Sequence, residues 1–435
     1  MTAEIAILNN QAVALAADSA VTADGPLGQK IFNTVNKLFT LSKHEPVGIM
    51  VYSSAEIIGV PVETVVKVYR ERLGKRAFLT LDEYASRFRE FLCEDKDVFP
   101  DEARAAHCRQ LFHAVIDLIW RLTLGELAHN YQDWGRPTAD EAKAAAESQI
   151  EKCHDRFTSS PELAGELEAA RGALRGLLAE GIDKAASAFE GRFGIDEQHR
   201  DLIAEIGVEM FVREAQIGVD TGVVVSGFGA EEIFPRLRSF EFESSFMGVH
   251  KFRKGNEADM GSTTGPSAYV APFAQREMVE TFMEGRSSQF DESLGRFMHD
   301  FFQARIGELG AVSGLDTEGR AAMTKFFEEM RNRISDEVVQ KLAGWTQERH
   351  VGPIMSTIMA MPKEELALMA EALVNLTAIK LHSSPSAETV GGPIDVAVIS
   401  KGDGFVWIKR KHYFEPALNP NFIHNYFRGG EPCED

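Results

Sequence analysis

The short apolar runs constrain the fold of this chain more than any other feature, because they lie near both ends with helical sequence between them. Residues 12–17 and 47–52 are continuous apolar runs of strand length. Such runs are typical of strands that are covered on both faces. Residues 394–399 and 405–408 flank a polar stretch that contains glycine, which predicts a strand, a turn and a strand. Strands that bracket helices in this way indicate one sheet-containing core.

The first seventy-five residues contain clear turn and helix signals. An Asn-Asn pair at Asn9 separates two apolar runs and predicts a hairpin. We expect a loop at residues 25–28. Residues 37–41 should pair with the run at 47–52 as a second set of strands. A proline and a glycine bound residues 61–73, where apolar side chains recur at helical spacing, so this segment is predicted to be a helix.

The middle of the chain has a different character. From about residue 80 to 215 it is rich in Ala, Glu, Arg and Leu, with helical periodicity. Strands are expected again at 221–229 and 240–252, and a loop at 255–265. Helices follow from about 272 to 348. The helices predicted for the first of these blocks cover residues 81–94, 101–125, 138–156, 160–192 and 196–214.

The composition is that of a globular protein and excludes several classes of partner. Hydrophobic residues make up 44% of the chain and charged residues 26%. The formal net charge is -20, whereas nucleic acids and anionic membranes require a positive surface. Four cysteines are too few for a disulfide scaffold. No leader or membrane segment is recognisable. We therefore expect a cytoplasmic protein that binds neither nucleic acid nor membrane.

The start of the chain carries a possible nucleophile. Thr2 follows the initiator methionine, and methionine before a small residue is normally removed. Thr2 would then carry a hydroxyl and an α-amine on one residue. The reference pKa of an α-amine is about 7.7–8.0, so the amine could accept the hydroxyl proton near neutral pH. This pairing makes the oxygen a nucleophile without a histidine.

Residues 2–22 resemble the start of the proteasome β-subunit family, and the HslV-type protease branch is the nearest analogy. The pattern is Thr-x-x-Ile-Ala-Ile, then Ala-Val-Ala-Leu-Ala-Ala-Asp-Ser-x-x-Thr, with the spacing from Thr2 to Asp18 matching without a gap. Lys37, before an apolar strand, is similar to the family's lysine. The resemblance covers roughly residues 2–75, 205–285 and 363–412.

The resemblance implies an N-terminal nucleophile hydrolase of α+β class. Its core would be a four-layer αββα sandwich of two antiparallel sheets that carries two inserted helical blocks. The expected division assigns 1–79, 205–285 and 363–417 to a discontinuous core, 80–204 and 286–362 to the two helical insertions, and 418–435 to a C-terminal tail.

The resemblance also implies roles for individual residues. Thr2 would attack the amide carbonyl, Lys37 would favour the alkoxide, and Asp18 would orient Lys37. Thr22 would line the cleft at a strand edge, where an extended peptide can bind as an added strand. A backbone amide at Tyr52 or Ser53 would stabilise the oxyanion.

The chain departs from the family pattern around the nucleophile. The family's glycine after the second strand pair is missing from residues 50–54, and residues 271–274 lack the family's serine. Glu388 or Thr389 would replace the family's later supporting acid and serine. Two alternatives to peptide hydrolysis therefore stay open. One is a weak or inactive structural or regulatory subunit, and the other is a small-molecule amidase on the same fold.

The expected partners follow from the resemblance. They are a peptide or protein substrate and further copies of the chain, which could form a ring, with an ATP-dependent unfoldase as an additional partner of unknown identity. We expect no cofactor and no metal. His107, Cys108 and His113 fit no structural zinc spacing, and neither does the Cys-His-Asp run at 153–155.

Overall fold

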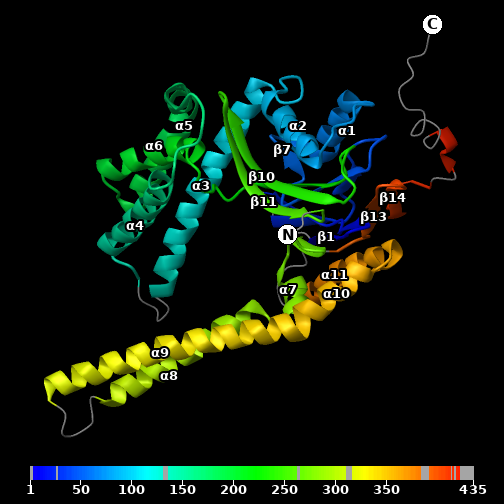
Figure 1. Ribbon diagram of the computed structural model, residues 1–435. Coiled ribbons are helices and arrows are strands. Elements are labelled where there is room, and N and C mark those ends of the chain that lie inside the picture. The colour runs from blue at the N-terminus through cyan, green and yellow to red at the C-terminus, as the bar shows by residue number, and fades with distance from the viewer. Residues whose placement is uncertain are drawn as a thin grey trace. The chain divides into compact units, whose positions relative to one another are not determined.

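The protein has a mixed α+β fold with antiparallel sheets (Figure 1). The structure is a computed structural model. Within the described residues, no helix combines the length and the apolar character needed to cross a membrane. The structure describes residues 3–25, 28–130, 136–261, 265–309, 316–383, 391–412, 414–415 and 418–421.

The chain folds into two compact units, and both are discontinuous in sequence. Unit 1 comprises Met1–Leu38, Ile233–Arg236 and Ala258–Ile423. Within the described residues, unit 2 comprises Phe39–Glu232 and Leu237–Glu257.

Unit 1 contains a five-stranded sheet whose neighbouring strands are antiparallel. The three central strands are buried along their whole length, as their continuous apolar sequence predicts. In the order in which they lie in the sheet, the strands are β12 (Ala268–Ala274), β1 (Ala3–Asn9), β2 (Ala12–Ala17), β13 (Asp395–Ser400) and β14 (Gly404–Lys409).

The hairpin between β1 and β2 depends on Asn9. Its side-chain oxygen accepts hydrogen bonds from the backbone N–H groups of Gln11 (2.9 Å) and Ala12 (3.2 Å) and so closes the turn. Its amide nitrogen donates to the carbonyl groups of Ile358 (3.0 Å) and Met361 (2.9 Å). The predicted hairpin is confirmed, and the same residue also anchors the end of a helix.

Helix α11 (Lys363–His382) packs on one face of this sheet, against β1 and β2 (Figure 1). Ile5 and Ile7 of β1 belong to the same apolar cluster as Leu366 and Leu373 of α11. Burial of each such side chain stabilises the fold by about 1.5–3 kcal/mol. The short helices α7 (Glu277–Glu284) and α10 (Gly352–Ala360) add to this cluster.

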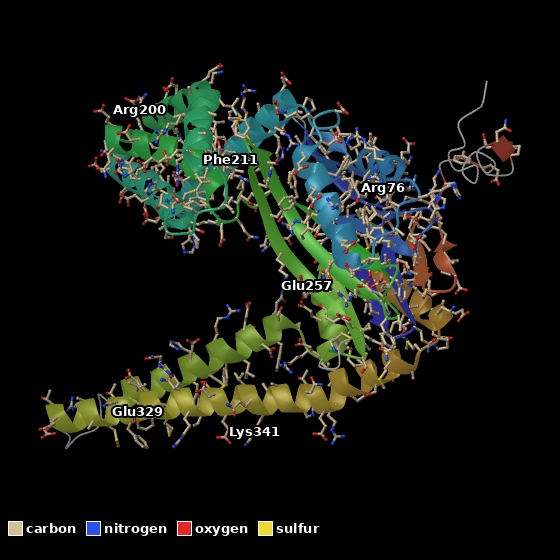
Figure 2. The ribbon with its side chains drawn as sticks, turned by 45° about the horizontal axis from the view of Figure 1, so that its top comes forward. Arg76, Arg200, Phe211, Glu257, Glu329 and Lys341 are labelled. Carbon is tan, nitrogen blue, oxygen red and sulfur yellow. The ribbon has the colours of Figure 1, made fainter. Side chains whose placement is uncertain are left out.

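Two long helices of unit 1 pair with each other. They are α8 (Ser288–Leu309) and α9 (Thr317–Thr346), and Figure 2 labels Glu329 and Lys341 on α9. Phe302 of α8 is buried, whereas most other side chains of the pair are exposed. A π-helical turn, Gln347–Val351, joins α9 to α10.

Unit 2 contains most of a second five-stranded sheet. Two helices, α1 (Val62–Leu73) and α2 (Leu81–Glu94), share an apolar cluster with this sheet, in which Val66 and Phe88 meet Val51 and Val225. A small ladder, β7 (Glu56–Ile57) with β8 (Val60–Pro61), precedes α1. The strands of the large sheet, in order, are β11 (Val249–Asp259), β10 (Arg236–Phe246), β9 (Thr221–Gly227), β6 (Val47–Tyr52) and β5 (Leu38–Thr40).

The remaining helices of unit 2 form a bundle with its own core. Phe112, Leu174, Phe189 and Phe211 are among its buried members, and Figure 2 labels Phe211. The helical character predicted from residue 80 onward is confirmed. The bundle comprises α3 (Asp101–Asn130), α4 (Ala139–Thr158), α5 (Leu167–Phe193) and α6 (Glu197–Val212).

Strands β3 (Val21–Gly25) and β4 (Gly28–Phe32) form a two-stranded sheet that the sequence analysis did not predict. They lie on either side of the expected loop at 25–28, whose residues 26 and 27 are outside the described residues. Two local predictions are wrong. β11 continues to Asp259 through part of the expected 255–265 loop. β12 occupies residues assigned to the start of a helix. Pro272 fits β12 because this strand is at the edge of its sheet, where a missing N–H breaks no ladder.

Candidate functional site

Asp18 lies directly after β2 and connects three segments of unit 1. Its Oδ1 accepts a hydrogen bond from the backbone N–H of Ala3 at 3.2 Å. Its Oδ2 accepts from the N–H groups of Ala20 at 3.3 Å and Gly391 at 3.0 Å. The residue is 1% exposed. Backbone N–H groups therefore satisfy both oxygens of this buried side chain.

Lys37 provides the counter-charge. Its Nζ lies 2.5 Å from Asp18 Oδ1, the oxygen that also binds the amide of Ala3. Only 4% of the Lys37 side chain is exposed. Loss of one partner from a buried pair typically costs about 3–5 kcal/mol, because it leaves an uncompensated charge. The two residues singled out from the sequence are therefore brought together, next to the residue that follows Thr2.

A second carboxylate, missed by the sequence reasoning, contacts the same lysine. Glu4 Oε1 lies 3.3 Å from Lys37 Nζ, and the Glu4 side chain is fully buried. Glu4 lies within β1, between Ala3 and Ile5. The signal that could have found it is a charged residue inside an otherwise apolar strand, where such residues are rare unless they are paired.

The segment before β13, residues 391–393, packs next to Asp18 and Ser19. The N–H of Ser19 donates to Gly391 O at 3.2 Å, and the Ser19 hydroxyl donates to the carbonyl of Pro393. Gly392 has a φ of 76°, and a Cβ there would lie 2.8 Å from the backbone oxygen of Asn33. Glycine is therefore required for the close approach that presents the Gly391 amide to Asp18.

Several predicted site residues cannot be placed in this cluster. Thr2, Glu388 and Thr389 lie outside the described residues. Thr22 belongs to β3, where it pairs with Ile31 of β4.

Tyr52 and Ser53, the predicted oxyanion residues, belong to unit 2. Tyr52 ends β6, and its hydroxyl donates to Glu241 Oε1 at 3.1 Å. Ser53 has a φ of 70°, and the Ser54 N–H donates to Tyr52 O at 2.9 Å across it. A γ-turn with positive φ at its centre is rare and strained.

The Ser53 side chain hydrogen-bonds to Asp220, an acid whose pKa is shifted. Burial raises the pKa of the Asp220 carboxyl, against the opposing effects of the Arg253 charge and a hydrogen bond from the Ser53 side chain. Arg253 Nη2 lies 3.7 Å from Asp220 Oδ2. A strained turn beside a half-buried acid with a raised pKa marks this end of β6 as a candidate functional segment.

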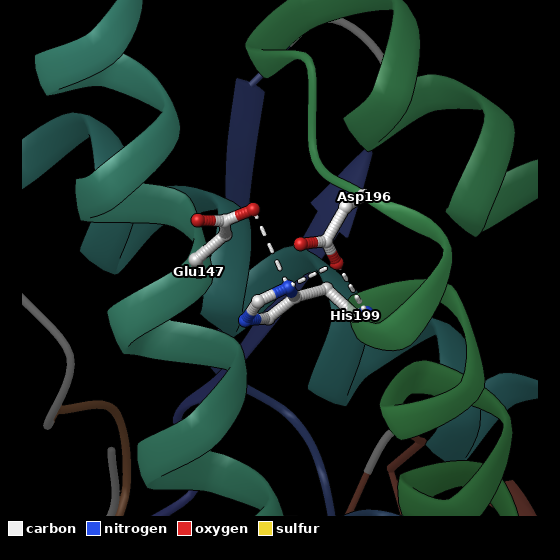
Figure 3. Close-up of side chains that lie close together, drawn as sticks. All are labelled: Glu147, Asp196 and His199. Atoms are coloured by element: carbon white, nitrogen blue, oxygen red, sulfur yellow. Dashed lines mark hydrogen bonds and ion pairs between the residues drawn. The ribbon is translucent and has the colours of Figure 1, made fainter.

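Glu147, Asp196 and His199 offer the ligand types of a metal site (Figure 3). His199 Nδ1 lies 2.6 Å from Asp196 Oδ1 and 3.3 Å from Glu147 Oε1. On the other side of the ring, Nε2 lies 3.3 Å from Glu151 Oε1. The ammonium of Lys143, 3.6 Å from Glu147 Oε1, occupies a position where it would repel a cation. Carboxylates at both ring nitrogens fit an imidazolium ion better than a metal ligand.

The charge of His199 follows from this arrangement. Burial disfavours the imidazolium, but the hydrogen bond to Asp196, the charge of Glu147 and the hydrogen bond to Glu151 outweigh it and raise the pKa. Asp196 also caps α6 by accepting the N–H of His199 at 3.1 Å. The cluster therefore acts as a charged clamp between α4 and the start of α6.

Other histidine and cysteine side chains named in the sequence analysis as possible metal ligands are accounted for by contacts within the protein. His107 Nε2 lies 2.9 Å from Glu243 O, and His154 Nε2 lies 2.7 Å from Glu205 Oε2. Burial raises the pKa of the Cys108 thiol to about 12, so this thiol is protonated at neutral pH. These side chains serve packing and ion pairing in unit 2.

The chain matches no family model and no curated protein sequence. Among solved structures it is similar to the Gly-1 mutant of Anbu from Hyphomicrobium sp. strain MC1, at 11% identity and a TM-score of 0.28 over 100% of both chains. Anbu from Yersinia bercovieri, described as an ancestral beta-subunit, matches at 8% identity and a TM-score of 0.26 over 100% of both chains. A helical assembly of the Anbu complex from Pseudomonas aeruginosa matches at 9% identity and 0.26 over 99% of this chain and 98% of that one.

These comparisons correct the resemblance stated for residues 2–22. The matching structures are Anbu proteins rather than HslV-type proteases, so the HslV-type assignment is wrong. TM-scores of this size carry no argument about activity. The functional argument therefore depends on the side chains around Asp18.

Proposed function

We propose that the chain is an N-terminal nucleophile hydrolase that cleaves amide bonds, with Thr2 as the nucleophile once Met1 is removed. The observation that supports this most directly is that one oxygen, Asp18 Oδ1, binds both the Lys37 ammonium and the N–H of Ala3. The residue bonded to Thr2 is thus held beside a buried cation. A cation next to a hydroxyl stabilises the alkoxide that attacks a carbonyl.

The proposed reaction has two halves. Thr2 Oγ attacks the amide carbonyl carbon while its proton passes to the Thr2 α-amine, and the ammonium so formed protonates the departing amine. The C–N bond breaks and an ester at Thr2 remains. Water then attacks this ester, gives its proton to the α-amine and releases the acid, which restores the Thr2 hydroxyl. Lys37 stabilises negative charge in both halves, and Asp18 orients Lys37.

Further parts of the site belong to the proposal. The strained turn at Ser53 supports an oxyanion role for the backbone amide of Tyr52 or Ser53, because backbone strain concentrates at functional positions. Thr22, on the short β3–β4 ladder, would bind the substrate backbone. Glu388 and Thr389 would support the nucleophile.

The finer architecture is also proposed. We assign residues 1–79, 205–285 and 363–417 to a four-layer αββα core, 80–204 and 286–362 to helical insertions, and 418–435 to a tail. The two antiparallel five-stranded sheets and the helices that pack on each of them support this division.

A peptide epoxyketone tests the chemistry. This probe forms a stable ring only with a hydroxyl and an amine on the same residue, so it reports both the removal of Met1 and the nucleophile. We expect intact mass spectrometry to show Met1 missing and one adduct on Thr2. Thr2→Ala should abolish the adduct, and Lys37→Met should slow its formation strongly. Lys251→Met removes another buried lysine, far from the chain start in sequence, and serves as the control.

The alternatives give different results. A retained Met1, or no adduct on a folded chain whose Thr2 is exposed as the terminus, would leave a structural or regulatory subunit. A small-molecule amidase would react with a small activated amide but not with peptides of several residues. Profiling with both substrate types at one enzyme concentration separates these activities.

We also propose that the protein is a cytoplasmic homo-oligomer. The paired helices α8 and α9 support this, because Phe290, Phe297, Phe301 and Phe326 are each 49–66% exposed on them. Exposed aromatic residues on one element are typical of an interaction surface. Mass photometry of the intact chain should show a multimer, and the double variant Phe297→Ser, Phe301→Ser should dissociate it. A monomer at micromolar concentration would refute this part.

A further inference from the structure

A cavity of about 580 Å³ lies in unit 1, where the start of α8 meets the end of α9. Pockets for small molecules usually measure about 300–1,000 Å³, and most of their lining is apolar with a few polar groups. This cavity has that composition, because aromatic and aliphatic side chains surround a single guanidinium group. The lining residues are Gly285, Arg286, Phe290, Leu342 and Trp345.

A π-helical turn shapes one wall of the cavity. The turn, Gln347–Val351, follows α9 directly, and the N–H of Gly352 donates to the carbonyl of Gln347, five residues back. In the same region the rings of Trp345 and His350, also five residues apart, have a centroid distance of 4.7 Å. Turns of this kind are rare and are found frequently at functional sites.

Gly285 allows the backbone after α7 to lie directly against this pair of rings. Its φ is 75°, which favours glycine. A Cβ on Gly285 would lie 2.3 Å from Cε1 of His350, so any side chain at this position would displace the imidazole. The shape of the cavity therefore depends on a glycine at one end of the wall and on the π-helical turn at the other.

Arg286 is the charged residue of the lining, and two of its three nitrogen atoms have protein partners. Nε donates to Asp291 Oδ1 at 2.7 Å, and Nη1 donates to Thr346 Oγ1. In the part of the chain that the structure describes, no hydrogen bond or ion pair involves Nη2. The side chain is 17% exposed. An N–H donor in apolar surroundings gains free energy when a ligand oxygen accepts from it.

The charge of Arg286 is already balanced by Asp291. A ligand carboxylate at Nη2 would lie close to the carboxylate of Asp291, and like charges repel. A neutral oxygen accepts the same hydrogen bond without this repulsion. The electrostatics of the cavity therefore favour an uncharged acceptor, such as the carbonyl oxygen of an amide, over an acid.

We propose that this cavity binds a small, uncharged aromatic compound that carries a carbonyl oxygen. Its ring packs against Phe290 and Trp345, and its oxygen accepts a hydrogen bond from Nη2 of Arg286. This inference does not depend on the proposed hydrolase activity, because no lining residue belongs to the cluster around Asp18.

Naphthylacetamide tests the proposal, with naphthylacetate as its charged counterpart. Both compounds are titrated into the intact chain in a calorimeter. We expect one amide to bind per chain, at least about tenfold more tightly than the acetate. No saturable binding of the amide, or equal affinity for the two compounds, would overturn the inference.

Two variants with matched controls locate the binding. Phe290→Ala removes an aromatic wall, and Gly285→Ala displaces His350, so each should weaken binding of the amide by about tenfold or more. Phe297, on the same helix, is 66% exposed and does not line the cavity, so Phe297→Ala should bind like the wild type. Gly295→Ala, with open space around its position on α8, should also bind normally.

The same variants distinguish a ligand from a second copy of the chain. Phe290 is 53% exposed, so Phe290→Ala should remain folded, and its thermal unfolding and its mass by mass photometry are recorded beside those of the wild type. Unchanged binding of the amide to this variant would refute the proposed site. Failure of the amide to bind the wild type, together with dissociation of a multimer in Phe290→Ala, would assign the cavity to a contact between copies and overturn the inference.

Discussion

Asp18→Asn removes the charge at the centre of the candidate site with almost no change in shape. Each oxygen of Asp18 accepts two donors: Ala3 N–H and Lys37 Nζ on Oδ1, and Ala20 N–H and Gly391 N–H on Oδ2. Asparagine has one oxygen. In either orientation its NH₂ group faces two donors, so two hydrogen bonds are lost.

The expected loss of stability follows from these contacts. A hydrogen bond to a charged group contributes about 1.5–3 kcal/mol, and two are lost. Removing one partner of a buried ion pair costs about 3–5 kcal/mol. Both figures describe the same change, so they are not added. We expect the free energy of unfolding of unit 1 to fall by about 3–5 kcal/mol.

Hydrogen exchange under increasing urea measures this loss in unit 1 peptides. Peptides that cover Ala20 and Gly391 should lose protection first, because their amides lose their acceptor. Asp403→Asn is the control: its carboxylate is exposed in the β13–β14 turn and pairs with Lys363, and such surface pairs contribute little. A loss below about 1 kcal/mol in Asp18→Asn would refute the network argument. Labelling of Thr2 by the epoxyketone should also be lost.

Three further predictions concern other positions. The pKa of His199 is raised in the folded protein, so the charged ring adds to the free energy of unfolding. This contribution is complete below the pKa of an unfolded histidine, about 6.5. It is lost as the pH rises through the higher pKa of the folded state. Urea unfolding of the wild type from pH 5.5 to 8.5 should show the loss, and His199→Gln should flatten it. Gly392→Ala should lower the free energy of unfolding by about 1–3 kcal/mol, because the position has a positive φ and its Cβ would lie too close to Asn33 O. Gly402→Ala should leave the free energy of unfolding unchanged, because the space around Gly402 is open. Native Cys108 should react with iodoacetamide at pH 8 at least about a thousandfold more slowly than an unfolded thiol, since its pKa is about 12; comparable rates would contradict its burial.

Local sequence patterns were sufficient for much of the secondary structure. The Asn9 turn, the helix from Val62 to Leu73 and the four-helix bundle each follow from turn chemistry or helical periodicity, which act over a few residues. The strand β12 was missed because its neighbour β1 is more than 250 residues away in the chain. Pro272 is acceptable because β12 is an edge strand. Which strand lies at the edge depends on the order of strands in the whole sheet, and the local sequence does not give that order.

The candidate site shows the same division between local and long-range information. The resemblance of residues 2–22 and Lys37 to the proteasome β-subunit pattern pointed to Asp18 and Lys37 as an acid and a lysine that could work together. Only the tertiary structure showed that Glu4 contacts the same ammonium and that Gly391 donates to Asp18. The physical reason is that burial and charge pairing depend on contacts between distant segments, whereas turns, strands and helices respond to neighbours along the chain.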